Sequence, residues 1–399
     1  MADLLALSEL EDRELVPEIL PVDARLSIAS QATVLTSLFS SAYDVTPAKE
    51  VIPYTSYTRL EALEGLMRVS ASDGERFIFV ESPVVIVKLT GNVLLPGKRI
   101  LDILKLVPEE TVRIDVIGTS ATIRSGRAVW KVETPPVDAS FPAAAILNEL
   151  QWLPIDRTSL VEALELILPA VSRTTARQSL MQAEIAKSIL TSCDGARAHR
   201  VKIDLPKSFK TTMPLRFIES AIKELKSSSE ETVYLWSNHS TVGLKHGSNK
   251  LFSQRLNFDY PPVNHLVLGP ALSNEERLIV NRRDLIDVIR RVRVSADPEF
   301  AAIFLSIREI GGQWLLTVSA RDKSGNASQE ILPASYDGPA ILKDITLNHR
   351  YFLEFLACIH TEEAELRLGE STKLKQAPVY YESEEFTGAI MVMAPNFVR

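Results

Sequence analysis

The chain has 399 residues, of which 46% are hydrophobic and 24% charged, and its formal net charge is −7. At roughly 100–200 residues per domain the length predicts about two to four domains, and the apolar fraction excludes a chain that is disordered throughout. The two cysteines exclude a disulfide scaffold and a four-cysteine zinc site, and they fit a reducing cytoplasm. The acidic balance excludes a protein whose whole surface coats nucleic acid.

The first 24 residues differ in composition from the rest. They hold seven acidic residues and one basic residue. No basic region followed by an apolar stretch is present, and the apolar runs of the chain are shorter than the ~20 residues that span a bilayer. We therefore predict a cytoplasmic protein with no membrane partner, and an acidic, solvated extension over residues 1–24. A short amphipathic helix over residues 4–15 is an alternative for part of it.

Three segments of the chain share one plan, in which a short apolar strand is followed by an amphipathic helix. The strands begin at Leu26, Leu153 and Leu278, so the spacing is 127 and then 125 residues. The helices predicted after them cover residues 31–43, 159–168 and 282–292.

Each segment continues with a strand that enters an acidic turn. These turns contain Asp73-Gly74, Asp194-Gly195 and Asp322. Asp-Gly is typical of tight turns because glycine adopts a positive φ without steric cost. A second helix is predicted after each turn, over residues 97–106, 215–226 and 349–359.

Alternating apolar and polar residues close each segment, which indicates strands with one buried face. The sequence therefore predicts an α+β protein of three repeated domains, each with antiparallel sheets and two helices on one face. The predicted boundaries are 25–145, 152–271 and 277–399, after the extension over 1–24.

Catalytic motifs give no support for an enzyme. No pair among the six histidines has zinc-ligand spacing, and no phosphate-binding loop is complete. Cys193 lies close in sequence to His199, but a buried thiol is the favoured interpretation over a nucleophile. We predict no catalytic residue, no metal and no cofactor. An enzyme that uses Cys193 or a pair of carboxylates is the least favoured hypothesis.

The basic residues are concentrated on the predicted helices. The six windows that contain these helices together carry a charge of +5, whereas the remainder of the chain carries −12. The windows are residues 30–45, 98–106, 158–177, 213–227, 281–294 and 347–360. On a single helix such bases usually pair with neighbouring acids. Repeated over corresponding helices, they favour a shared positive surface that contacts phosphates without reading bases.

Several short segments, in this order and spacing, resemble the bacterial DNA polymerase III β subunit, the sliding clamp. They are Leu95–Leu104, Ala121–Arg127 with Phe141-Pro142, Cys193–Arg197, Asp297–Phe300, Leu347–Leu353 and Ile390–Pro395. The resemblance covers about residues 25–399.

The resemblance implies a DNA clamp fold: a head-to-tail homodimer closes a ring of six domains, with sheets outside and helices lining the hole. A ring of this kind encircles duplex DNA as a processivity factor and is not an enzyme. The basic residues that the resemblance assigns to the DNA-binding surface are Lys98, Arg99, Lys105, Arg173, Arg177, Arg216 and Lys223. From charge alone we add Arg282, Arg283 and Arg290.

Family members also bind DNA polymerases and clamp loaders through a short peptide that carries Gln and bulky apolar residues. Matching positions predicts a pocket formed by Leu180, Cys193, Gly195, Arg197, Pro261, Leu266, Phe300, Asn348, Tyr351, Val392, Met393 and Pro395. An apolar groove with a few polar groups suits an extended peptide. Ordinary core packing is an equally good interpretation of Leu180, Leu266 and Met393.

The chain also departs from the family pattern. Ala196-Arg197-Ala198 stands where the family commonly has His-Arg-Leu, and the ending Asn396–Arg399 lacks the usual Met-Pro-x-Arg. Together with the acidic extension, these departures indicate a divergent or secondary clamp. An alternative is a clamp-like decoy or regulatory scaffold that binds partner peptides without productive loading onto DNA.

Overall fold

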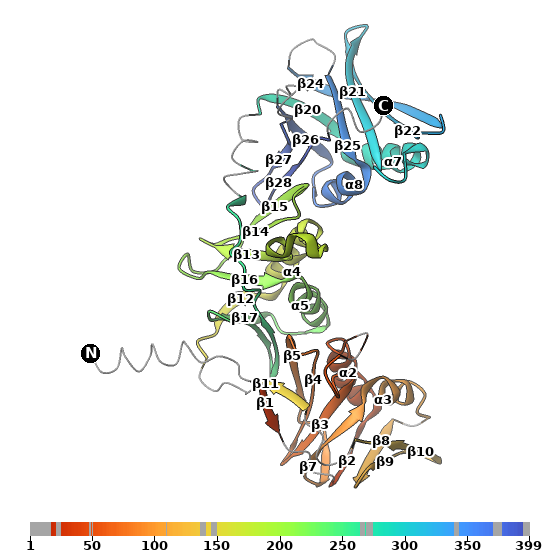
Figure 1. Ribbon diagram of the computed structural model, residues 1–399, viewed down its shortest axis with the longest axis vertical. Helices are drawn as coiled ribbons and strands as arrows, with labels where there is room; N and C mark the ends of the chain where they lie inside the picture. Colours follow the sequence, from red (N-terminus) through yellow and green to blue (C-terminus); the bar gives the residue numbers. More distant parts are fainter. Residues whose placement is uncertain are drawn as a thin grey trace, which may run out of the picture. The chain divides into compact units, whose positions relative to one another are not determined.

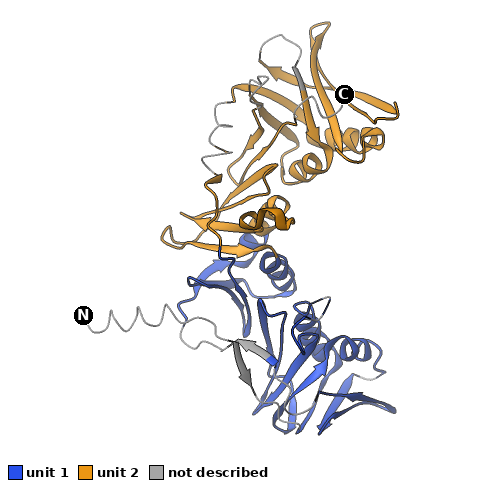
Figure 2. Ribbon diagram, in the orientation of Figure 1, with its two compact units in different colours: residues 1–161, 216–257 blue, residues 162–215, 258–399 orange. Residues whose placement is uncertain are grey.

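The structure is a computed structural model. It describes residues 17–20, 25–47, 49, 51–108, 110–135, 141–144, 150–263, 268, 274–338, 343–369 and 377–393. The chain forms two compact units (Figure 2): unit 1 is residues 1–161 with 216–257, and unit 2 is residues 162–215 with 258–399. None of the helices described is both long and apolar enough to cross a bilayer.

Unit 1 contains two large antiparallel sheets (Figure 1). The five-stranded sheet has the order β10-β9-β8-β2-β6, with bounds Ala128–Glu133, Ser120–Ser125, Thr111–Ile117, Arg25–Gln31 and Ile86–Leu89. The eight-stranded sheet has the order β12-β17-β18-β19-β5-β4-β3-β7, with bounds Leu153–Asp156, Thr232–Ser237, Thr241–His246, Asn249–Gln254, Arg76–Ser82, Leu66–Ser72, Tyr57–Leu63 and Gly91–Pro96.

Unit 2 has the same plan. Its nine-stranded sheet has the order β16-β13-β14-β15-β28-β27-β26-β20-β24, with bounds Thr211–Pro214, Gln182–Ala186, Ile189–Cys193, Arg197–Lys202, Phe386–Ile390, Val379–Glu382, Glu363–Leu368, Glu276–Asn281 and Ser335–Asp337. Its four-stranded sheet has the order β23-β22-β21-β25, with bounds Ala327–Pro333, Gln313–Arg321, Ala302–Ile310 and Lys343–Asn348.

All six predicted helices are present, and their ends differ from the prediction by at most two residues. They are α2 (Ala32–Tyr43), α3 (Gly97–Leu104), α4 (Arg157–Ile167), α5 (Leu215–Ser227), α7 (Arg282–Val292) and α8 (His349–Ala357). Short 3-10 helices are η1 (Leu168–Ala170), η2 (Thr175–Leu180) and η4 (Arg293–Ser295). In unit 1, α2 and α3 pack side by side (Figure 1). In unit 2, α7 contacts α8.

Helix α7 shows why these residues form helices. Its N-cap Asn281 accepts hydrogen bonds from the backbone N–H groups of Arg283 and Asp284, so two otherwise unpaired donors are satisfied. Its buried residues recur at helical spacing and form one apolar face, which leaves the arginines on the solvent side. The buried residues are Leu285, Val288, Ile289 and Val292.

Each large sheet is continuous across a junction between predicted repeats. In unit 1, β19 of the second repeat pairs with β5 of the first through Phe252 and Phe77. In unit 2, β15 of the second repeat pairs with β28 of the third through His199 and Gly388. The second repeat thus contributes strands to both units, and the predicted division into three domains stays a prediction.

The segment predicted as an acidic extension contains a strand near its end. β1 (Pro17–Leu20) pairs antiparallel with β11 (Phe141–Ala144). The extension expected over residues 1–24 thus includes a segment whose backbone is paired, and its solvated state stays a prediction. The alternative helix over residues 4–15 lies outside the described residues.

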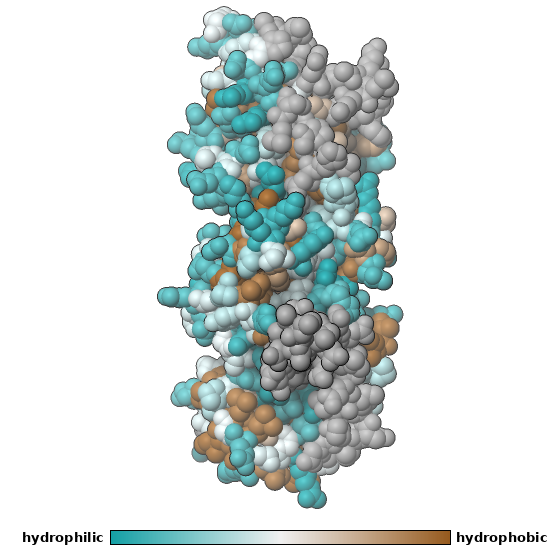
Figure 3. Space-filling view, turned by 90° about the vertical axis from the view of Figure 1, so that its left-hand side faces the viewer, coloured by the Kyte–Doolittle hydropathy of each residue, from teal (hydrophilic) through white to brown (hydrophobic). Residues whose placement is uncertain are grey.

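Large apolar side chains are exposed at several places on unit 1. Val51, Ile86, Leu106, Ile117 and Val129 are each more than half exposed. In the view of Figure 3, brown apolar side chains gather over the lower part of the unit, on a surface that is otherwise largely hydrophilic. Contiguous exposed apolar surface commonly marks an interaction site.

Candidate functional site

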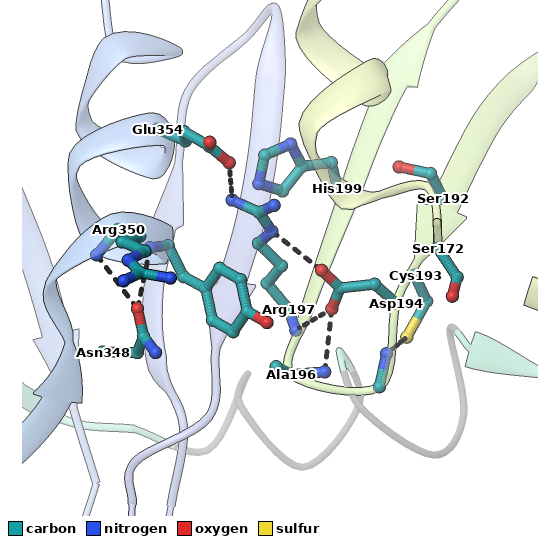
Figure 4. Close-up of polar contacts among 12 residues, drawn as sticks. Ser172, Ser192, Cys193, Asp194, Ala196, Arg197, His199, Asn348, Arg350 and Glu354 are labelled. Atoms are coloured by element: carbon teal, nitrogen blue, oxygen red, sulfur yellow. Dashed lines mark hydrogen bonds and ion pairs between the residues drawn. The ribbon is translucent and has the colours of Figure 1, made fainter. Parts of the chain in front are cut away.

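The turn between β14 and β15 in unit 2 is the centre of the predicted pocket. The Oδ1 atom of Asp194 accepts hydrogen bonds from the backbone N–H groups of Ala196 at 2.8 Å and Arg197 at 2.9 Å (Figure 4). Gly195 has a φ of +90°, which favours glycine. The Cys193 thiol accepts a further hydrogen bond from the Gly195 N–H. The turn is therefore rigid and holds Arg197 in place.

The guanidinium of Arg197 joins this turn to helix α8. Its Nε donates to Oδ2 of Asp194 at 3.0 Å, and its Nη1 donates to Glu354 at 2.5 Å (Figure 4). The same guanidinium lies 4.6 Å from the ring centroid of Tyr351. The side chain is only 6% exposed, so two carboxylates compensate its buried charge.

A groove of about 650 Å³ opens over this pair. One wall is the segment around η1, and the other is the start of α8. The lining residues are Leu168, Pro169, Val171, Ser172, Arg173, Thr174, Asp194, Arg197, Arg350, Tyr351 and Glu354. A second groove of about 530 Å³ lies along η2 and is lined by Thr175, Ala176, Arg177, Gln178, Ser179, Leu180, Phe258 and Pro261.

Arg177 links the two grooves through the glycine of the turn. Its Nη1 donates to the backbone oxygen of Asp194 at 3.4 Å, and a Cβ on Gly195 would overlap the guanidinium. Any side chain at this position would therefore displace Arg177. Glycine is therefore favoured here for two reasons: it adopts the positive φ of the turn, and it leaves room for the guanidinium of Arg177.

An apolar cluster lies beneath the second groove. Leu180, Cys193 and Tyr380 are buried in it, and Tyr260 packs against it. The other members are Ala198, Val263, Leu268 and Ala389. Burial raises the pKa of the Cys193 thiol, which keeps it protonated. The predicted buried thiol is confirmed.

A buried histidine joins β15 to the neighbouring elements. The Nδ1 atom of His199 lies 2.7 Å from the backbone oxygen of Leu166, and its ring packs edge-on to Phe386 at 5.0 Å. Burial lowers the pKa of His199 to about 3, so the ring is neutral and Nδ1–H donates to the carbonyl. Its role is core packing.

The structure brings most of the predicted pocket residues into one region of unit 2. Leu180, Cys193, Gly195, Arg197, Pro261 and Tyr351 belong to the turn, the two grooves and the apolar cluster. The side chain of Asn348 caps α8 and donates to the backbone oxygen of Phe300 at 3.2 Å.

The segment after β28 runs beside the turn. The Met391 N–H donates to the Ala196 oxygen at 2.7 Å, and the Met393 N–H donates to the Thr346 oxygen at 2.8 Å. Val392 lies between them and is half-buried. The predicted Leu266 and Pro395 lie outside the described residues.

Two charged residues of the first groove were not among the predicted site residues. Arg350 and Glu354 are four residues apart on α8, so they lie on one helix face, and Tyr351, three residues before Glu354, lines the same groove. The sequence predicted a helix over 349–359 and placed Tyr351 in the pocket, so helical spacing from Tyr351 could have pointed to both residues. Asp194 was recognised only as a turn residue.

Most of the predicted DNA-binding side chains are exposed. Lys98 and Arg99 lie on α3, and Lys105 caps its C-terminal end. Arg216 and Lys223 on α5 are 62% and 60% exposed, yet each is within ion-pair distance of an aspartate of the first repeat. Arg173, Arg177, Arg283 and Arg290 are also exposed.

Arg282 differs from the other predicted bases. It is half-buried, and its guanidinium donates to the backbone oxygens of Thr361 at 3.0 Å and Leu356 at 3.4 Å. Arg282 therefore ties α7 to the end of α8. Its predicted contact with DNA is untested.

Two family models match this chain. The N-terminal domain of the DNA polymerase III beta subunit matches residues 26–144, and the C-terminal domain of the same subunit matches residues 271–393. The two matches together cover more than half of the chain. The chain therefore belongs to the DNA polymerase III beta subunit family.

Similar proteins agree with this assignment. The beta sliding clamp of Synechococcus elongatus is 24% identical over 82% of this chain and 88% of its own length. That of Rickettsia felis is 21% identical over 93% and 99%. A crystal structure of the Bartonella birtlesii DnaN sliding clamp bound to griselimycin matches with a TM-score of 0.83 at 18% identity, over 92% of this chain and 99% of that one. The predicted α+β clamp fold is thus confirmed.

Proposed function

We propose that the protein is a DNA sliding clamp, a non-catalytic processivity factor of the cytoplasm that encircles duplex DNA and tethers a DNA polymerase. The observation that carries the proposal is the clamp fold over 92% of the chain, combined with a cationic surface on its helices. Three repeated domains with the predicted boundaries would supply three pairs of such helices to each protomer.

The charge distribution supports sliding contact. On α7, Arg283 and Arg290 are exposed, and the Arg290 guanidinium only meets Asp287 at 3.4 Å in an exposed pair. Exposed pairs of this kind contribute little, so the arginines are available to phosphates. Contacts to phosphates carry no information about the DNA sequence, so the protein could slide along it. The net negative charge of the chain repels DNA from the rest of the surface.

A closed ring requires a second copy of the chain. Strand β10 is one edge of the five-stranded sheet in unit 1, and Val129 on it is 54% exposed. Strand β23 is an edge of the four-stranded sheet in unit 2, and Ile331 on it is 54% exposed. Unpaired apolar edges favour strand pairing with another chain. A head-to-tail homodimer would cover both edges.

Polymerase, clamp loader and other partners would bind through peptides at the two grooves of unit 2. The grooves combine the apolar Leu180 and Pro261 with the fixed guanidinium of Arg197. Such a surface suits an extended peptide with bulky apolar residues.

Loading onto nicked circular DNA by a cognate clamp loader tests the proposal. The double variant Arg283→Glu, Arg290→Glu should load less and lose DNA at lower salt than the wild type, because fewer counterions are released on binding. Arg308→Glu is a control for a single charge reversal, half the change of the double variant, at an exposed position of strand β21. A wild-type protein that binds partner peptides but never stays on circular DNA would instead support the decoy scaffold.

Light scattering tests the ring closure. Val129→Glu should shift the protein from dimer to monomer, whereas Ile86→Glu should not. Ile86 is a matched control because it is 64% exposed on β6, the opposite edge of the same sheet. A wild-type protein that is monomeric at micromolar concentration would contradict the proposal.

A further inference from the structure

The first groove of unit 2 is lined by three arginines and two carboxylates. Both carboxylates that line it, those of Asp194 and Glu354, contact Arg197. Arg173 and Arg350 are exposed in the same lining, and Arg177 stands exposed at the neighbouring groove. A chain whose net charge is −7 therefore places exposed arginines beside a groove that also has apolar lining residues.

Arg350 has a defined place at the start of α8. It is the second residue of α8, and its backbone N–H donates to the Asn348 side chain at 3.0 Å, which fixes its place in the first turn (Figure 4). Among the described residues its guanidinium makes no ion pair. It is free to bind a carboxylate in two parallel hydrogen bonds.

The corresponding residue of the second repeat behaves differently. Arg216 is the second residue of α5, and its guanidinium lies 3.5 Å from the carboxylate of Asp73. Asp73 is the counterpart of Asp194 in the earlier turn. The arginine at this helix position thus has an ion-pair partner in unit 1, whereas in unit 2 it has none among the described residues.

We propose that the groove of unit 2 selects partner peptides in which an acidic side chain flanks the apolar residues, and that Arg350 binds this carboxylate. The inference rests on the proposed peptide-binding function and adds its charge specificity. Glu354 lies one turn further along α8, but its carboxylate is engaged by Arg197 and opposes the acidic ligand only weakly. Charge complementarity of this kind gives specificity more than total affinity.

Fluorescence anisotropy with labelled synthetic peptides tests the inference on the full-length protein. The probes share a Gln-Leu-Ser-Leu-Phe core and carry two Glu, two Gln or two Lys residues at the N-terminal end, with a second set extended at the C-terminal end. For one of the two ends we expect the Glu-flanked peptide to bind about tenfold more tightly than the Gln-flanked one.

Arg350→Gln should bring the affinities of the Glu- and Gln-flanked peptides together, and Arg350→Glu should reverse the preference toward the Lys-flanked peptide. Arg216→Gln is the matched control and should leave the preference unchanged. If the Glu- and Gln-flanked peptides bind the wild type equally at both ends, the inference is overturned while the proposed groove stands. If no peptide binds, the proposed peptide-binding function fails as well. A preference for Glu that survives Arg350→Glu also overturns the assignment to Arg350.

Discussion

Two turns with the same local structure, one in each unit, lead to different surfaces. In unit 1, Oδ1 of Asp73 accepts from the Arg76 N–H at 2.7 Å, and Oδ2 accepts from the Arg76 Nε at 2.9 Å. In unit 2, Asp194 and Arg197 make the same two contacts at 2.9 and 3.0 Å. Each arginine then reaches the helix of the following repeat.

The difference lies in what each arginine meets there. Arg76 donates to the Ser220 hydroxyl at 2.6 Å and to the Val45 oxygen at 3.3 Å, and the space beside it is about 290 Å³. Arg197 meets a half-exposed carboxylate, and its groove is about 650 Å³.

The residue over the turn glycine also differs. In unit 1 the apolar Ile52 lies against Gly74, where unit 2 has Arg177 against Gly195. The repeated turn therefore connects two elements in unit 1, whereas in unit 2 it also forms a wall of the first groove.

Removing the arginine of each turn should give the largest effect and separate the two roles. Arg197→Met removes a buried guanidinium and leaves the half-buried Asp194 without its charged partner, so we expect the free energy of unfolding to fall by about 3 kcal/mol. Affinity for the Gln-Leu-Ser-Leu-Phe peptide should fall about tenfold. Urea denaturation and anisotropy measure these two quantities.

Arg76→Met is the matched variant in unit 1. It should lose a similar free energy of unfolding and keep the peptide affinity of the wild type. Equal loss of peptide binding in both variants would remove the distinction between the two turns.

Acid should destabilise unit 2 through His199, the second residue after Arg197. Because its pKa is about 3 in the fold and about 6.5 unfolded, the unfolded state takes up the proton first. Stability is therefore complete above pH 6.5 and falls as the pH decreases toward 3, by up to ~1.4 kcal/mol per pH unit.

The corresponding residue of unit 1 is Ile78, which is buried and does not titrate. Thermal unfolding from pH 7 to 5 should show a smaller decrease in melting temperature for His199→Ile than for the wild type. His349, with a pKa lowered to about 4 by burial, should retain the residual acid sensitivity. An unchanged pH profile would show that His199 does not titrate in this range on unfolding.

Glycine substitutions in the turns should have a moderate effect. Both Gly195 and Gly74 have a positive φ, of +90° and +93°, so alanine at either position should cost about 1 kcal/mol. Only Gly195→Ala should also weaken peptide binding, because it displaces Arg177. Melting temperature and peptide anisotropy check both parts, and peptide binding that survives Gly195→Ala would exclude Arg177 from the groove.

The smallest effect is expected at the pair between Lys223 and Asp44, beside the turn of unit 1. Lys223 is 60% exposed, so Lys223→Gln should change the free energy of unfolding by less than ~1 kcal/mol. The salt dependence of DNA binding should nevertheless become shallower, because one phosphate contact is lost. An unchanged salt slope would remove Lys223 from the DNA-binding surface.

Much of this site was accessible from the sequence where the determinants are local. The Asp-Gly signal in both turns predicted a tight turn, and the turns are present. The apolar periodicity and the Asn281 cap are local features of α7, so its bounds could be predicted without knowledge of its neighbours. The charges of Arg350 and Glu354 were visible, but Arg197, the partner of Glu354, comes from β15 and could not be predicted from the local sequence.

By itself the sequence determined the helices, the acidic turns and the repeated order of elements, because hydrogen bonds and packing within about 12 residues decide them. Only the tertiary structure decided that β15 pairs with β28 and β19 with β5, since any unpaired strand edge can in principle accept many others. Those long-range pairings bring Arg197 to Glu354 and Arg76 to Ser220. The residue that each arginine contacts lies more than 140 positions further along the chain, so it could not be predicted from the turn itself. These contacts decide that only the turn of unit 2 lines the larger groove.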